Sequence, residues 1–164
     1  MNTNPLLSAS VAIRGLTQTL RNLQDAVDLL DRLEKAVPSS RAQRAPNVSV
    51  SNVSLTTQML PDGSGVPGVA TATTGEKGYK TRITFQPKQG FNCTCPDLQN
   101  RKMACKHVAA LAVACRKRFW AITDLIENDV ERFSIQIVEL ENVAEKLSVE
   151  TLSSLGSSLK ALES

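Results

Sequence analysis

The chain has 164 residues, of which 41% are hydrophobic, and its formal net charge is +3. This length allows one domain, or one small domain that carries extended helical arms. The longest apolar run, residues 108–115, is too short to cross a bilayer, and the N-terminus lacks the basic stretch, apolar core and cleavage site of a secretory signal. We therefore expect an intracellular protein, cytoplasmic or, in a eukaryote, nuclear, with no membrane partner.

A regular apolar spacing predicts a long helix at the N-terminus. The apolar residues follow alternating steps of three and four, as in the seam of a coiled coil. They are Ile13, Leu16, Leu20, Leu23, Val27 and Leu30. The helix is predicted over residues 5–37 and ends at Pro38, so that residues 1–38 form the first region. Two interpretations stay open, because such a helix packs either against a helix of its own chain or against another chain.

Alternating apolar and polar residues predict a small antiparallel sheet in the middle of the chain. A second region, residues 39–78, is predicted to hold a linker at 39–46 and the first strands, and a loop or turn is expected at 61–65. A second turn is expected at 87–90. The predicted strands cover residues 47–58, 66–74, 79–86 and 91–95.

The chain after residue 107 is predicted to be helical. Residues 108–120 are rich in alanine and leucine, and the last region, residues 119–164, is an acidic arm with two heptad lines. The first line is Ile137, Leu140, Ala144 and Leu147, and the second is Leu152, Leu155, Leu159 and Leu162. We therefore expect an α+β fold, in which long N- and C-terminal helices flank a small sheet and the C-terminal arm has two segments.

Three of the four cysteines and the only histidine form a metal-ligand pattern: Cys93, Cys95, Cys105 and His107. Three thiolates and one imidazole are a common closed ligand set for structural Zn²⁺. Cys93 and Cys95 are too close in sequence to hold two separate disulfide loops, which disfavours a disulfide scaffold. Cys105 and His107 point about 200° apart on a continuous helix, so they must straddle a helix start to share one ion. Cys115 has no place in this pattern and is expected in the core.

The segment CTCPDLQNRKMACKHVAAL resembles the SWIM zinc finger, in ligand order and in the residues Pro96, Asp97 and Lys106. The resemblance covers residues 79–118 and implies a ββα zinc module that binds nucleic acid or a protein partner. Members of this family occur in transposases, chromatin remodellers, ubiquitin ligases and small recombination-mediator subunits. No transposase, ATPase or ligase segment accompanies the finger here, which favours a small adaptor or structural protein.

Charge is divided unevenly along the chain. Residues 77–118 hold ten basic side chains against one acidic, a net charge of +9, whereas residues 119–164 hold three against nine, a net charge of −6. A basic zinc module suits phosphate contact. The candidate nucleic-acid contacts are Arg101, Lys102, Lys106, Arg116, Lys117 and Arg118. The basic residues also fit a solvated face, or a docking site for the acidic arm of the same or a neighbouring chain.

Taken together, these patterns predict a non-enzymatic zinc adaptor that contacts DNA, a nucleoprotein complex or a protein partner and assembles through its helical arms. The alternative is a structural subunit of a multi-subunit particle, viral ones included, with zinc as a folding staple. A Cys–His nucleophile pair would leave the Cys93–Cys95 pair unexplained. No phosphate-binding loop, dinucleotide fingerprint or carboxylate pair appears, so no small-molecule substrate is expected.

Overall fold

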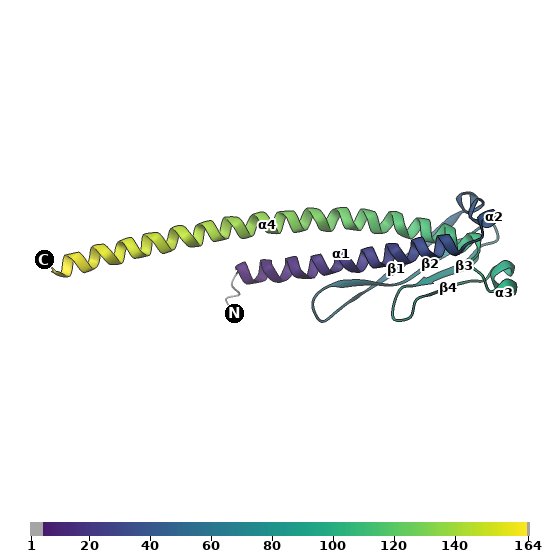
Figure 1. The fold of residues 1–164 in the computed structure, drawn as a ribbon, viewed down its shortest axis with the longest axis horizontal. Helices are drawn as coiled ribbons and strands as arrows, with labels where there is room; N and C mark the ends of the chain where they lie inside the picture. The colour runs from purple at the N-terminus through teal and green to yellow at the C-terminus, as the bar shows by residue number, and fades with distance from the viewer. Residues whose placement is uncertain (1–4, 164) are drawn as a thin grey trace.

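The structure, a computed structural model, describes residues 5–163. Two long helices lie side by side and antiparallel, and a four-stranded sheet packs against them near one end of the molecule (Figure 1). The elements are α1 (Pro5–Ala36), α2 (Ser39–Ala42), η1 (Ala45–Asn47), β1 (Val50–Met59), β2 (Gly65–Thr74), β3 (Tyr79–Thr84), β4 (Gly90–Cys93), α3 (Pro96–Arg101) and α4 (Lys106–Glu163). The predicted α+β class is confirmed. Residues 1–4 and 164 of the predicted terminal regions lie outside the described residues.

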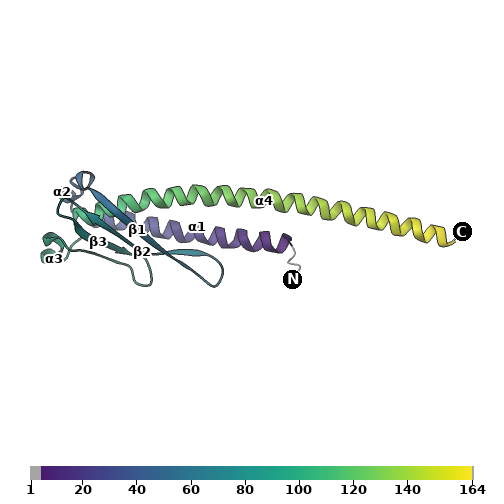
Figure 2. The same cartoon turned by 180° about the vertical axis from the view of Figure 1, so that it is seen from behind.

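The sheet is an antiparallel meander with the strand order β1-β2-β3-β4. Because successive side chains of a strand point to opposite faces, the alternation in sequence sends one set of residues toward the helices. Ala70 pairs with Ile83 and Ala72 with Thr81 on this inner face. The observed strands agree with the predicted ones to within about three residues. The view from behind shows the same two layers, with the helix pair on one side of the strands (Figure 2).

A single apolar cluster joins the helices to the sheet. Leu30 of α1, Ile83 of β3 and Leu111 of α4 are fully buried in it. Phe85 meets Phe119 edge to face, with ring centroids 5.4 Å apart. The seam residues Leu23 and Val27 of α1 are buried in this cluster as well, so α1 packs within its own chain.

Polar contacts fix α1 against the sheet and against α4. The Thr19 hydroxyl accepts a hydrogen bond from Gly65 N at 2.8 Å, and Asn22 Nδ2 donates to Gly65 O at 2.9 Å. Arg116 of α4 forms ion pairs with two acidic residues of α1, Asp31 at 2.7 Å and Glu34. These contacts fix how α1 lies on the rest of the protein.

Two predictions about the chain's connections are corrected. Residues 39–46, predicted as a linker, contain the short helix α2 and the start of η1. The C-terminal arm is not two segments, because α4 runs without a break from Lys106 to Glu163 and crosses the predicted boundary at residues 118 and 119. No residue of α4 forces a break in the helix. The helix contains no proline, and its glycine, Gly156, is tolerated at a modest cost.

The last part of α4 stands apart from the rest of the structure. The N-terminal end of α1 lies beside α4 residues 133–143, and α4 continues well beyond it (Figure 1). Every residue after Leu140 whose side chain the structure describes is exposed, including Leu152, Leu155 and Leu159. Within residues 5–163, no helix is long and apolar enough to cross a membrane.

Candidate metal centre

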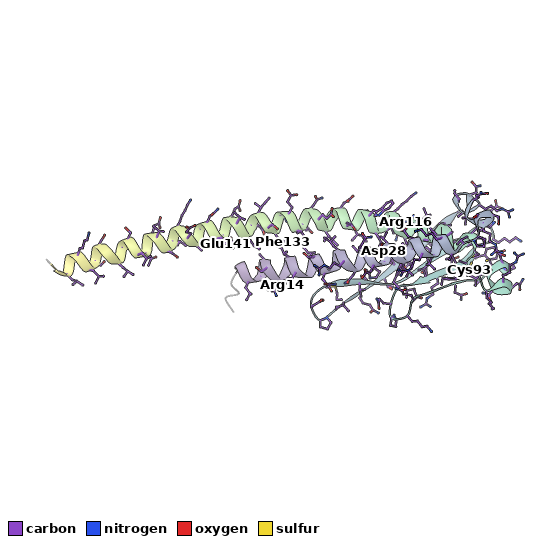
Figure 3. All side chains as sticks on the ribbon, in the orientation of Figure 1. Arg14, Asp28, Cys93, Arg116, Phe133 and Glu141 are labelled. Atoms are coloured by element: carbon purple, nitrogen blue, oxygen red, sulfur yellow. The ribbon has the colours of Figure 1, made fainter. Side chains whose placement is uncertain are left out.

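Cys93, Cys95, Cys105 and His107 converge on one buried site. Their ligand atoms all lie within 4.8 Å of one another. Cys93 ends β4, Cys95 precedes α3, Cys105 precedes α4 and His107 lies in the first turn of α4. The site therefore sits at the end of the molecule opposite the free part of α4, as the positions of Cys93 and Glu141 show (Figure 3). The predicted straddling of a helix start by Cys105 and His107 is confirmed.

The sequence between the two ligand pairs builds a short helix that brings them together. Cys95 is the N-cap of α3, where its sulfur accepts a hydrogen bond from Leu98 N at 3.5 Å. Pro96 occupies the first helical position, where a missing N–H costs nothing. Lys102 ends α3 with a left-handed backbone, φ +56°, which turns the chain back toward Cys105. This local geometry places the second ligand pair beside the first.

Side chains of the sheet surround the sulfur of Cys93. The Thr81 hydroxyl lies 3.3 Å from Cys93 Sγ, and Thr74 lies 2.7 Å from Thr81 in turn. Gln99 of α3 donates to the Cys93 carbonyl at 2.7 Å. Groups that contact a metal ligand, rather than the metal itself, orient that ligand and tune its charge. The sequence patterns did not identify these residues, because their role depends on strand register rather than on ligand spacing.

His107 presents an unpaired ring nitrogen within the cluster. Its Nδ1 is buried and has no hydrogen-bond partner, while the ring packs against Tyr79 at a centroid distance of 5.0 Å. A buried polar atom without a partner costs free energy, and a bound cation would remove that cost. Together with the sulfurs of the three cysteines, a ring nitrogen of His107 completes a donor set that fits Zn²⁺.

The charges of the ligands depend strongly on one another. A hydrogen bond from the Cys105 thiol lowers the pKa of Cys93 to about 5, and the same contact raises the pKa of Cys105. Burial raises the pKa of Cys95 and lowers the pKa of His107. These shifts favour one thiolate, a neutral imidazole and retained protons on the other sulfurs. A divalent cation would replace those protons, since metal ligands bind in their deprotonated form.

Cys115 is separate from the site, as predicted. Its thiol is buried in the core, and burial raises its pKa to about 11. A thiol that keeps its proton is a poor ligand and a poor nucleophile. In the part of the chain that the structure describes, the four ligands are the one group of histidine, cysteine or acidic residues close enough to hold a metal ion.

The six basic residues proposed for nucleic-acid contact do not form one free surface. Arg101 pairs with Asp97 at 3.6 Å, and Arg118 donates to the Val53 carbonyl at 3.2 Å. Arg116 is only 16% exposed and is held by the two acidic residues of α1, so we no longer place it at a nucleic-acid surface. Lys102 and Lys117 are exposed, and Lys106 is half-buried beside His107.

Comparison of the chain with protein-family models, with curated proteins and with solved structures found no match. The likeness to the SWIM finger therefore rests on the sequence between Cys93 and Leu111 alone.

Proposed function

We propose that this protein is a non-enzymatic adaptor, in which zinc staples a SWIM-type finger over residues 79–118 and α4 carries the contacts that assemble it with other chains. One observation carries this proposal. The second half of α4 is largely exposed, and the same unbroken helix begins at the buried four-ligand site. The finger end is proposed to contact DNA, a nucleoprotein complex or a protein partner.

The distal arm, defined as residues 141–163, is poorly suited to exist as a lone helix. It would be about 34 Å long at 1.5 Å per residue. It contains several serines, two valines, a threonine and Gly156, all weaker helix formers than alanine. Most helical stability in proteins comes from packing of an apolar face, and every described side chain of the arm is exposed. The arm therefore needs a partner to remain helical.

Apolar residues of α4, interrupted once by Ser148, form a seam for such a partner. The seam runs in steps of three and four, with three successive steps of four at its centre, the mark of a coiled-coil stutter. Its positions are Phe133, Ile137, Leu140, Ala144, Ser148, Leu152, Leu155, Leu159 and Leu162. The first positions of the seam lie beside α1, and the last positions are exposed. A partner helix would therefore pack on α4 beyond the point where α1 begins.

The metal site supports a structural role rather than a catalytic one. A closed set of four protein ligands leaves no position for a substrate or a water molecule. The chain's one histidine belongs to this set and is unavailable as a general base. Zinc would then act through folding, because binding free energy at such a site contributes directly to folding free energy.

The proposal is tested with the full chain and two variants, L155Q/L159Q in the seam and L125Q at an exposed position of α4 outside the seam. We expect light scattering to show an oligomer for the full chain and for L125Q, and a smaller species for L155Q/L159Q. Zinc content should stay at one ion per chain in all three. A monomeric full chain, or a mass that L155Q/L159Q does not change, contradicts assembly through the arm.

The second candidate function is a structural subunit of a multi-subunit particle. The length of α4, 58 residues, favours it, because a helix of this size makes contacts far from the finger. The same light-scattering experiment separates the two functions. A small closed oligomer whose mass is independent of concentration supports the adaptor, whereas growth into large assemblies supports the particle subunit.

A further inference from the structure

The face of the sheet that points away from the helices is mostly polar, although alternation also brings the half-buried Val69 of β2 to it. Alternation along the strands brings Lys80 and Arg82 of β3 to this face, because the alternate residues Thr81 and Ile83 are buried on the side of the helices. We call the residues that pair across this face the open sheet face: Ser51, Ser54, Thr71, Thr73, Lys80, Arg82, Asn92 and Thr94. All eight are exposed except Thr73, which is half-buried. Neither long helix covers it (Figures 1 and 2).

The charge on the open sheet face has a single sign. None of the four strands contains an aspartate or glutamate. Lys80 Nζ donates to Thr73 Oγ1 at 3.2 Å, and among the described residues neither Lys80 nor Arg82 makes an ion pair. The two cations lie two residues apart on one strand, about 6.6 Å along it. Hydroxyl and amide groups flank them on both sides, with Thr71 and Asn92 directly opposite Arg82.

We propose that the open sheet face binds the sugar–phosphate backbone of a nucleic acid. This inference rests on the nucleic-acid contact of the proposed function and moves that contact from the cations of α3 and α4 to the sheet. Phosphate oxygens are bound in proteins by Arg and Lys and by Ser, Thr and Asn side chains, which are the groups present here. An acidic partner is favoured because no carboxylate on the strands repels it.

The chemistry of this face also defines how the nucleic acid is bound. The aromatic residues of the sheet region, Tyr79, Phe85 and Phe91, pack on the core side. The open sheet face therefore offers no ring on which bases stack, and stacking is what usually holds splayed single strands. Binding through phosphates alone is independent of sequence and strongly dependent on salt.

The arginines among the cations proposed earlier, Arg101, Arg116 and Arg118, are weaker candidates for the same contact. Arg101 and Arg116 are paired with acidic residues, and Arg118 is bonded to a backbone carbonyl. A phosphate would have to displace these partners before it could bind. Lys80 and Arg82 need no such exchange, since the one bond that Lys80 makes is to a neutral hydroxyl.

The experiment measures binding of the zinc-loaded full chain to a short random-sequence duplex by fluorescence anisotropy at several salt concentrations. The test variant is K80Q/R82Q, and the matched control is K102Q/K117Q, which removes the same charge from exposed positions away from the sheet face. Each lost phosphate contact lowers the slope of log affinity against log salt by about 0.9. We expect the slope to fall by about 1.8 in K80Q/R82Q and to stay near the wild-type value in K102Q/K117Q.

The possible results distinguish binding at the open sheet face from nucleic-acid contact in general, the proposed function on which it rests. If the wild type binds and both variants lose affinity equally, only net charge matters and the open sheet face is not the site. If K80Q/R82Q changes the oligomer mass and leaves duplex binding intact, the face binds the acidic arm of another copy, which also overturns the inference. If the wild type fails to bind at low salt, nucleic-acid contact itself is refuted, while assembly through the arm stands on its own test.

Discussion

His107 lies directly against the backbone of Gly75, in the turn between β2 and β3. A Cβ on Gly75 would lie 3.1 Å from His107 Nε2, closer than nearly all real contacts of that kind. The backbone of Gly75 also has φ +72°, a left-handed conformation that residues with side chains rarely adopt. A glycine in a turn thus allows the chain to close over a metal ligand that is distant in sequence.

Replacement of Gly75 by alanine should weaken metal binding. The backbone cost is about 1 kcal/mol, and the new methyl group, 3.1 Å from His107 Nε2, requires the imidazole ring or the turn to shift. The matched control is Gly78→Ala, which has φ +66° and brings its Cβ no closer than 3.5 Å to Thr73 Cγ2. We expect both variants to lose similar intrinsic stability, and zinc affinity, measured by competition with a chelator, to fall only in Gly75→Ala. Equal affinities in the two variants would show that the turn does not position the histidine.

Loss of a ligand should affect the protein differently from loss of a core thiol. Cys93→Ala removes a sulfur of the site, whereas Cys115→Ala removes a sulfur of the same size from the core. We expect Cys93→Ala to abolish stoichiometric zinc under reducing conditions and to unfold the region around β4 and α3. Cys115→Ala should keep its zinc and lose about 1 kcal/mol of stability. Metal analysis and thermal unfolding, each with and without chelator, measure both effects, and zinc retained by Cys93→Ala would refute the ligand assignment.

The ion pairs of Arg116 should stabilise the fold more than those at the surface. Arg116→Met leaves Asp31 and Glu34 without their common partner. The side chain of Arg116 is only 16% exposed, so water replaces it poorly. We expect the free energy of unfolding to fall by about 1–3 kcal/mol. The control, Arg132→Met, breaks the exposed pair with Asp129 and should cost less than about 1 kcal/mol. Urea unfolding of the zinc-loaded proteins compares them, and equal midpoints would mean that Arg116 does not hold α1 against α4.

The helix of the distal arm should respond to substitution of Gly156. No atom outside its own helix lies within 4 Å of a Cβ at this position, so alanine fits without a clash. Gly156→Ala should stabilise the arm by about 1 kcal/mol, and Gly156→Pro should break it. Hydrogen exchange of the arm amides should become slower in the first variant and faster in the second. If neither changes the exchange, the arm is not helical in solution.

The local features of this protein were predictable from its sequence. The period of the apolar residues indicated α1 and the strands, and the spacing of Cys105 and His107 required a helix start between them. Both inferences concern residues near one another in the chain, where periodicity and bond geometry limit the possible structures. The division of the C-terminal arm into two segments was wrong because a shift between two heptad lines does not interrupt the backbone hydrogen bonds of a helix.

The sequence by itself determined the α+β class, the candidate ligand set Cys93, Cys95, Cys105 and His107, and the division of charge along the chain. Only the tertiary structure decided that α1 packs within its own chain, that Arg116 is occupied by α1, that Gly75 lies over His107 and that Lys80 and Arg82 lie on an uncovered face. The physical reason is distance along the chain. A side chain's partners on other elements depend on how those elements pack, and residue spacing within one segment carries no information about that packing.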